Sequence, residues 1–346
     1  MNNIPLVRVR YAGSFAKELH KLGAPTERVL NTVGLSEEIL DIPDGFMPVE
    51  QLLRFAEQAR RYTGIADIGL AAGLTPFGQH SQAGHNVMVC TNLYQAIVLF
   101  CKQGNSEITN SNFHIRQQQT MVWFCGGVVE GTDNEIRQVE LYRIGIMIQV
   151  IRAAMGINWE PYELRLQSKN DKSLYDTELI RNANVRFGCK MLAIGIPHYA
   201  FALTLQHTKD QSPVANSELV LLSESDTSLE YSVKEIIRTH IRAHQSGIKN
   251  VAKALDLSVR SLQRRLAENE LIFSHLLEQT RIETALMMLE NSNVSIIEVA
   301  MEVGYKEASH FARAFKRNTG LTPQQYRFQY QTENIKSTAS SLHVNI

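Results

Sequence analysis

The 346-residue sequence predicts two domains of different fold class, an α+β domain followed by an all-α domain. Three observations lead to this prediction. A pattern of helix, turn and basic helix occurs twice near the C-terminus. A stretch with the periodicity of one long helix separates the two copies. Residues 1–205 instead mix helical periodicity with short runs rich in Ile, Val, Phe and Trp, which favour strands.

The clearest pattern is the later copy, residues 296–317. Its first half, IIEVAMEVGY, has apolar residues at helical spacing and reaches a turn at Gly304, a residue type that adopts a left-handed backbone at little cost. Its second half, KEASHFARAFKR, predicts a second helix with a basic edge. Parts in this order can place a helix in the DNA major groove, where each base pair presents a distinct pattern of donors and acceptors.

The earlier copy spans residues 247–266, GIKNVAKALDL followed by SVRSLQRRL. At an offset of 48 residues, Val251, Ala252, Leu255 and Leu257 match Val299, Ala300, Val303 and Tyr305. Beyond the turn the offset is 49, and Leu262, Arg264 and Leu266 match Phe311, Arg313 and Phe315. The matched apolar positions predict a buried inner face, and the matched alanines suit a close helix crossing.

The turn of the earlier copy has its own signals. Asp256 stands at the position of Gly304, and Asp is one of the few other residue types that enters the left-handed region. Ser258 follows as the expected N-cap of the second helix.

Between the copies, residues 273–290 have the periodicity of one continuous helix, with an apolar side formed by Leu276, Leu277, Thr280, Ile282, Ala285, Leu286 and Leu289. At about 1.5 Å per residue such a helix is roughly 27 Å long. Two recognition helices held apart by this long helix could enter successive major grooves on one face of a duplex, whose repeat is about 34 Å.

These parts resemble the DNA-binding domain of the AraC/XylS family of bacterial transcription regulators. The resemblance covers about 100 residues and rests on residues 258–266, on Arg281 and Ala285, and on the block from Ile297 to Arg327, which includes GLTPQQYR at 320–327. Asp256 and Glu270 depart from the family pattern, which usually has Gly at both positions.

The resemblance implies six base-reading residues, whose side chains can all bond base edges, namely Arg260, Gln263, Arg264, Ser309, His310 and Arg313. Arg can bond guanine bidentately, Gln can do so with adenine, and Ser or His can add single hydrogen bonds. A second set is placed to contact phosphates and fix register, and it comprises Ser258, Arg265, Lys306, Lys316 and Arg317. The alternative for any single residue is an ordinary solvated helix face, but the repetition of the set favours DNA.

Charge is divided between the halves. Residues 231–330 hold 14 Lys and Arg against 10 Asp and Glu, whereas residues 1–230 hold 20 against 24. The net charge of zero therefore conceals a basic C-terminal domain. A neutral chain disfavours nonspecific coating of DNA, which needs many phosphate neutralisations.

The N-terminal region predicts helices at 8–22, 25–33, 48–62, 93–103 and 133–155, a hairpin of strands at 107–116 and 120–129, and further strands at 162–167 and 191–196. It resembles the arabinose-binding-like effector domain of one branch of the same family. That resemblance rests on Gly69-Leu70 with Gly73, and on NLYQA at 92–96, YELRL at 162–166 and VRFGC at 185–189. It implies a sensor domain whose small-molecule effectors vary and include hydrophobic acids.

Candidate effector-pocket residues are Phe113, His114, Arg116, Trp123 and Tyr142, with core packing or surface charge as the alternative explanation of each. His80, His85 and Cys90 do not share a helical face, so no metal site is expected, and no cofactor motif is found. Cys90, Cys101, Cys125 and Cys189 lack a Cys-x-x-Cys pair and predict buried, reduced thiols.

The expected organisation is an α+β effector-sensing and dimerisation domain at 1–206, a linker at 207–230 with a short helical piece at 218–222, a double helix-turn-helix domain at 231–330, and a flexible tail at 331–346. No apolar run of about 20 residues and no signal segment is found, which predicts a cytoplasmic protein without a membrane span.

The leading hypothesis is a regulator that binds promoter DNA, with an effector, a homodimer partner and RNA polymerase as further partners, and with activation favoured by the resemblance. Two alternatives remain open. One is a DNA-targeted enzyme, such as an alkyl-transfer repair protein with a reactive cysteine, although none of the four cysteines lies in a nucleophile motif. The other is a helical protein-interaction module.

Overall fold

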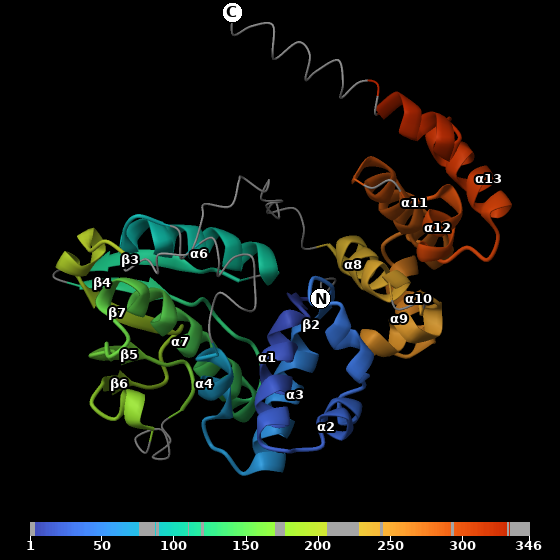
Figure 1. Ribbon diagram of the computed structural model, residues 1–346. Coiled ribbons are helices and arrows are strands. Elements are labelled where there is room, and N and C mark those ends of the chain that lie inside the picture. Colours follow the sequence, from blue (N-terminus) through green and yellow to red (C-terminus); the bar gives the residue numbers. More distant parts are fainter. Residues whose placement is uncertain are drawn as a thin grey trace, which may run out of the picture. The chain divides into compact units, whose positions relative to one another are not determined.

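The computed structural model describes residues 4–75, 87, 90–109, 111–118, 121–169, 177–205, 228–242, 245–291, 294–330 and 332. The chain forms two compact units, one within Asn3–Thr227 and one within Ser228–Ile346 (Figure 1). The short helix expected at 218–222 lies outside the described residues, and so does the expected tail apart from Thr332.

The N-terminal unit is α+β, as predicted. Its helices are α1 (Arg10–Lys21), α2 (Thr26–Thr32), α3 (Val49–Thr63), α4 (Ile68–Gly73), α6 (Leu93–Glu107) and α7 (Asp133–Met155), with short 3-10 turns η1 (Glu37–Asp41), η4 (Glu178–Ile180) and η5 (His198–Ala202). Its strands are β1 (Leu6–Arg8), β2 (Phe46–Pro48), β3 (His114–Gln118), β4 (Met121–Cys125), β5 (Glu163–Arg165), β6 (Asn184–Arg186) and β7 (Ala193–Pro197).

The strands form two sheets. β1 and β2 pair as a small antiparallel ribbon, and the other five lie in the order β3-β4-β7-β5-β6. Only β5 and β6 are parallel among these neighbours. The expected hairpin is the pair β3–β4, but its first strand begins at His114 and not at Glu107, because α6 continues through Glu107. The three-residue strands β1, β2 and β6 were too short to give an alternating pattern.

The long helix α7 is the centre of the N-terminal core. Its residues Ile144, Met147 and Ile148 are fully buried, and the inner face of the large sheet adds Phe124 and Ile194 to the same cluster. α7 begins with a capping box in which Thr132 and Glu135 satisfy each other's backbone donors.

Glycines allow α4 to lie directly against α7. A Cβ atom at Gly69 would meet the backbone oxygen of Gln138 at 2.0 Å, and one at Gly73 would meet that of Tyr142 at 2.2 Å. Gly145 on α7 faces the same crossing, where a Cβ would lie 2.7 Å from the carbonyl carbon of Gly73. The two helices therefore touch backbone to backbone, and no larger residue fits at the crossing.

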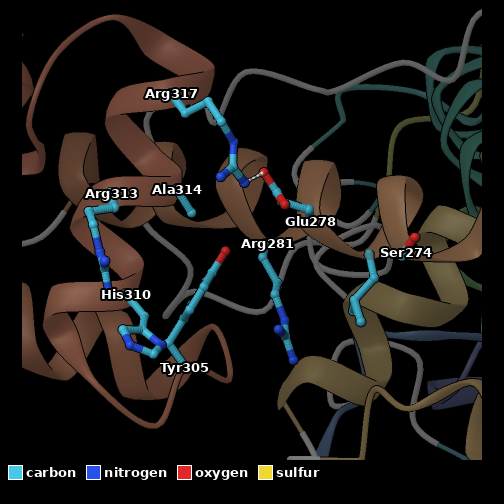
Figure 2. Close-up of a pocket in the computed structure, with 9 residues that line it drawn as sticks. Ser274, Glu278, Arg281, Tyr305, His310, Arg313, Ala314 and Arg317 are labelled. Atoms are coloured by element: carbon cyan, nitrogen blue, oxygen red, sulfur yellow. Dashed lines mark hydrogen bonds and ion pairs between the residues drawn. The ribbon is translucent and has the colours of Figure 1, made fainter.

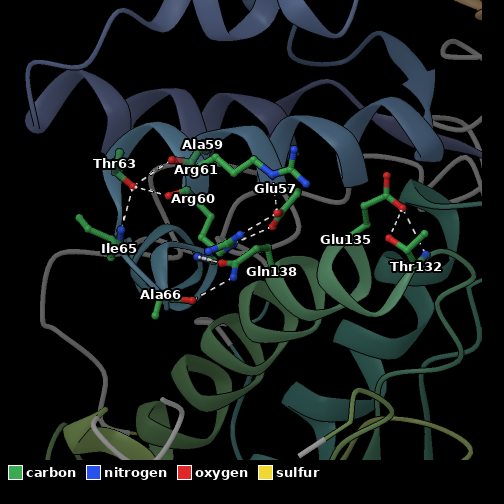
Figure 3. A network of polar contacts seen from close by, with 11 residues as sticks. Glu57, Ala59, Arg60, Arg61, Thr63, Ile65, Ala66, Thr132, Glu135 and Gln138 are labelled. Carbon is green, nitrogen blue, oxygen red and sulfur yellow. Dashed lines mark hydrogen bonds and ion pairs between the residues drawn. The ribbon is translucent and has the colours of Figure 1, made fainter. Parts of the chain in front are cut away.

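Figure 3 shows polar contacts within α3 and around Gln138 of α7, at the start of α4. The buried Glu57 carboxylate accepts hydrogen bonds from Arg60 and Arg61 on the same helix, at 2.8 Å each. The Gln138 side chain donates to the Ala66 carbonyl and accepts from the Gly69 amide. Burial alone would raise the pKa of Glu57, but the two guanidinium groups outweigh it and the pKa is lowered.

The C-terminal unit is helical in its described parts. Its helices are α8 (Leu229–Arg242), α9 (Ile248–Ala254), α10 (Val259–Ala267), α11 (Phe273–Asn291), α12 (Ile296–Glu302) and α13 (Ala308–Thr319). α8 begins at Leu229, inside the segment expected as linker. α11 corresponds to the long helix expected at 273–290.

α11 makes contacts with α8, α12 and α13 and so connects the parts of the C-terminal unit. Glu283 on α11 accepts from Lys234 at 3.0 Å and from Arg238 at 3.1 Å, both on α8. The predicted apolar side is also present, with Leu276, Ile282 and Leu289 buried.

No helix in the described part of the chain is long and apolar enough to cross a membrane.

Candidate nucleic-acid interface

The two helix pairs α9–α10 and α12–α13 have the same turn, hydrogen bond for hydrogen bond. The Leu257 amide donates to the Ala252 carbonyl at 2.9 Å, and the matched Tyr305 amide donates to the Ala300 carbonyl at 2.9 Å. One residue earlier, Asp256 donates to Lys253 at 3.0 Å and Gly304 donates to Met301 at 2.9 Å. The repeat found in the sequence is therefore a repeat of backbone geometry.

The two departures from glycine both have left-handed backbones. Asp256 has a φ of 54° and Glu270 has a φ of 59°, and they are the only non-glycine residues with positive φ among those described. The first lies in the turn between α9 and α10, and the second follows α10 before α11 begins. The chain keeps the backbone that glycine favours and accepts the strain of a Cβ atom there.

Apolar residues anchor the inner faces of α10 and α13. Leu262 and Leu266 of α10 are buried, as are Phe311 and Phe315 of α13. Ser258 caps α10 by accepting from the Ser261 amide at 3.0 Å, as predicted.

The outer faces carry the predicted contact residues. All six predicted base-reading residues are exposed, with Arg260, Gln263 and Arg264 on α10 and with Ser309, His310 and Arg313 on α13. Of the predicted phosphate contacts, Ser258, Lys306, Lys316 and Arg317 are exposed and Arg265 is half-buried. Each pair therefore presents one helix whose exposed side offers donors of the kind that bond base edges and phosphates.

Three of the six predicted base-reading residues have an acidic partner nearby. Arg264 lies 3.7 Å from Glu268 across one helical turn, and its side chain is 72% exposed, so solvent screens this pair. At the start of α13, the Glu307 carboxylate accepts from Ser309 at 3.3 Å and lies 3.5 Å from His310. No ion pair to Arg260 or Arg313 is found among the described residues.

A cleft of about 500 Å³ lies between α11 and α13 (Figure 2). Three guanidinium groups line it, those of Arg281, Arg313 and Arg317, together with His310. Glu278 is the one carboxylate among its lining residues, and Figure 2 shows its side chain reaching toward Arg317. The cleft is a cationic recess beside the exposed face of α13.

Two lining residues of this cleft, Glu278 and Arg281, were not among the predicted site residues. Both lie on α11, which was expected only to hold the two recognition helices apart. A signal for them was present in the sequence. Glu278 and Arg281 lie three positions apart and outside the apolar side of the helix, where charged side chains can contact a neighbouring element.

The five predicted effector-pocket residues do not come together in one place. Phe113 is buried in the core, where its ring meets that of Phe100 edge-on at 5.3 Å. Tyr142 is also buried, stacks on Phe15, and lies within hydrogen-bond distance of Ser14 at 3.2 Å. Burial raises the pKa of Tyr142.

His114, Arg116 and Trp123 lie on the opposite, outer face of the large sheet. Arg116 is the cross-strand partner of Trp123. The Arg165 guanidinium covers the Trp123 ring at 3.6 Å from its centroid, and a Cβ on Gly195 would come within 3.4 Å of the indole. On this outer face the Trp123 ring is only 3% exposed beneath Arg165, and the exposed Arg116 lies beside it, so the two arginines are the groups that suit an anionic partner.

A concave site among the described residues of the same unit lies elsewhere. A cleft of about 400 Å³ is lined by Leu70, Leu74 and Leu179, by the charged groups of Asp67, Arg152 and Glu160, and by Ala71 and Thr177. None of the five predicted residues lines it. Its size falls within the range of small-molecule sites.

No disulfide joins the four cysteines, of which Cys101 and Cys125 are buried while Cys90 and Cys189 are partly exposed. Burial raises the pKa of the Cys90 and Cys125 thiols, and it raises the pKa of Cys101 to about 12. Higher thiol pKa values reduce the thiolate fraction, the reverse of what an alkyl-accepting nucleophile needs. No cluster of three potential metal ligands occurs among the residues that the structure describes.

Together, an α+β domain followed by a helical domain with two matched, cation-bearing helices defines a class of two-domain DNA-binding protein. Comparison with protein families agrees in both halves. Residues 251–329 match the profile of a helix-turn-helix domain, and residues 23–205 match that of the arabinose-binding domain of AraC transcription regulators. The chain belongs to the AraC family and is a DNA-binding transcription regulator.

Known transcription regulators are similar to this chain over different lengths. The ornithine utilization regulator of Pseudomonas aeruginosa is 20% identical over 348 residues, covering 93% of this chain and 96% of that protein. The regulator GadX of Escherichia coli K12 is 28% identical over 165 residues, which is 47% of this chain and 57% of GadX. Among solved structures, the transcriptional regulator CdpR from Pseudomonas aeruginosa aligns with a TM-score of 0.35 and 19% identity, over 75% of this chain and 85% of CdpR.

Proposed function

We propose that the two helix pairs are helix-turn-helix units and that α10 and α13 are their recognition helices, which enter two successive major grooves of one promoter site. The observation that carries the proposal is the matched turn, because the same backbone geometry in both pairs is followed each time by an exposed helix with an arginine at the equivalent position, Arg264 or Arg313.

Within this proposal the exposed residues divide by chemistry. Arg260, Gln263 and Arg264 read bases from α10, and Ser309, His310 and Arg313 read bases from α13. The contacts to phosphate come from Ser258, Arg265, Lys306, Lys316 and Arg317, and they set register without adding sequence preference. α11 is the linker that separates the two units.

A DNA-binding measurement tests this proposal. The full chain is titrated against the region upstream of its own gene and against random DNA of equal length, at several salt concentrations. Selective binding with a negative dependence on salt is expected, since cationic contacts release counterions. Equal affinity for both DNAs would contradict sequence-specific regulation and leave only nonspecific binding or a protein-interaction role.

We further propose that the N-terminal domain tunes DNA binding through a small-molecule effector, homodimerisation or both, and that the output is activation through RNA polymerase. The family of this domain supports effector sensing. An effector changes DNA occupancy only if its affinity differs between two states of the protein. Two places in the described part of this domain suit an organic acid, namely the outer sheet face with His114, Arg116 and Arg165 and the cleft with Arg152.

Fluorescence can decide between these two places. The chain has two tryptophans, and the Trp159→Phe variant leaves Trp123 as the sole tryptophan, which can be excited selectively over tyrosine. Titration with hexanoate and decanoate should then change the emission if the acid binds the outer face. Saturable binding that Arg152→Ala abolishes and Arg116→Ala leaves intact would move the effector site to the cleft. Absence of binding and of any change in DNA affinity would contradict sensing of carboxylic acids.

A further inference from the structure

One arginine of the linker helix touches both helix pairs. The Arg281 side chain leaves α11 and donates a hydrogen bond from Nη2 to Ser246 Oγ at 3.3 Å. Ser246 is buried and directly precedes Gly247, the N-cap of α9 in the first pair. The same guanidinium lies 5.2 Å from the ring centre of Tyr305, which ends the turn of the second pair.

The turn of the second pair lies close to this guanidinium. A Cβ atom on Gly304 would lie 3.1 Å from Arg281 Nη2 and 3.5 Å from Arg281 Cζ. Glycine at this position therefore serves two needs, a φ of 85° and room for the guanidinium. The matched turn of the first pair holds Asp256, so the left-handed backbone by itself does not demand glycine.

The contact is not an ordinary surface ion pair. Arg281 is half-buried, and no carboxylate in the described part of the chain forms an ion pair with it. Burial lowers its pKa, and the facing Tyr305 acts in the opposite direction. A partly desolvated guanidinium that bridges a hydroxyl and an aromatic ring is suited to fixing geometry, because both contacts depend on direction and distance.

We propose that Arg281 is a positioning residue that fixes the orientation of the first helix pair relative to the second, so that α10 and α13 can engage one DNA molecule together. This rests on the proposed function of the two pairs. Arg281 joins the start of one pair to the turn of the other through a single side chain. Its loss should leave each pair folded and able to bind its own half of the site, but the two halves should no longer reinforce one another.

The test uses the full chain and three DNA duplexes. The first is a site selected by the wild-type protein from a random pool, and in the other two either half of that site is scrambled. Arg281→Met keeps the aliphatic stem and removes the guanidinium. It should weaken binding to the intact site about ten-fold, the scale of a modest coupling between sites, while binding to each half-scrambled duplex stays within about two-fold of wild type.

Circular dichroism and the melting temperature show whether Arg281→Met folds. If it does not, variants that each remove only one of the two contacts take its place in the test. Ser246→Ala removes the hydrogen bond, and Tyr305→Leu removes the ring but keeps an apolar group. Each should show the same pattern with a smaller loss, and Arg281→Lys should recover only part of the wild-type affinity because a lysine cannot span both contacts.

Two outcomes would overturn the proposal. One is an equal loss on all three duplexes, which would make Arg281 a direct phosphate contact. The other is unchanged affinity for the intact site. If the wild-type protein selects no sequence from the pool, the proposed function fails, and that outcome is distinct from a failure of the role of Arg281.

Discussion

The Glu278 carboxylate on α11 accepts a hydrogen bond from Arg317 on α13 at 2.5 Å, and one from the adjacent Asn318 at 2.7 Å. The hydrogen bonds from Arg317 and Asn318 lower the pKa of Glu278, so this carboxylate stays ionised at neutral pH. Arg317 is a predicted phosphate contact, and in the DNA-free protein its cation already has an anionic partner.

Glu278 should therefore compete with DNA for Arg317. Glu278→Gln is expected to raise affinity for DNA a few-fold, by about 1 kcal/mol at low salt, because a phosphate no longer has to displace a carboxylate. Fluorescence anisotropy on labelled duplex measures the change. Glu302→Gln is the matched control, since Glu302 is exposed on α12 and changes net charge equally. Equal gains in the two variants would indicate a general charge effect, and a loss in Glu278→Gln would contradict the competition.

The strained backbone at Glu270 should be relieved by glycine. Glu270 is exposed and has a left-handed backbone, so Glu270→Gly removes a Cβ penalty of about 1 kcal/mol or more. Glycine also increases the chain entropy of the unfolded state, which offsets part of this gain. A net gain of about 0.5–1 kcal/mol is expected in urea unfolding. Glu268→Gly, two residues earlier at a φ of −61°, should be destabilising instead. A destabilised Glu270→Gly variant would show that the glutamate makes a compensating contact.

The C-terminal unit could be predicted closely because its signals are local. The 48-residue offset, the left-handed turn residue and the Ser258 cap each depend on a few neighbours in sequence, and the structure has the corresponding helices, turns and cap. The exposure of Arg264 and Arg313 followed from the same periodicity. What the sequence could not give was the long-range placement of Arg281, whose partners Ser246 and Tyr305 are distant along the chain.

The N-terminal unit was harder to predict for the same reason. Helices with caps and clear stripes, such as α7, were found, whereas β1, β2 and β6 exist only through pairing with distant strands. The candidate effector residues were chosen by residue type. Type alone does not reveal on which face of a sheet a residue lies, and Phe113 and Trp123 lie on different sides.

The backbone contact between α4 and α7 makes a strong prediction for the N-terminal unit. Gly73→Ala places a methyl group against the Tyr142 carbonyl and should destabilise this unit by about 3 kcal/mol. Gly13→Ala, in α1 with nothing within 4 Å of its Cβ position, should be neutral or stabilising by about 0.5 kcal/mol. Calorimetry of both variants measures the difference. Similar melting curves for the two would refute the close crossing.

Glu57 should give the N-terminal unit a dependence on acid. Its pKa in the folded protein is lowered, so the stabilisation it gives is present above the unfolded value of about 4.3 and is lost as pH falls through the folded value. Glu57→Gln is expected to lower the free energy of unfolding by about 2 kcal/mol at pH 6. Below about pH 4 the difference in unfolding free energy between the variant and the wild type should become smaller. Urea unfolding at both pH values measures this. A difference in unfolding free energy that grows in acid would contradict a lowered pKa for Glu57.

The central claim is that α10 and α13 each read bases. Affinities of Arg264→Ala and Arg313→Ala for the selected site and for random DNA test it most directly. Each variant should lose about 1–3 kcal/mol on the selected site and far less on random DNA, and repeated selection should show relaxed preference at one position, different for the two variants. Lys316→Ala should lower the affinity for both DNAs by a similar factor. If the arginine variants also lose the same amount of affinity for both DNAs, the base-reading assignment is contradicted.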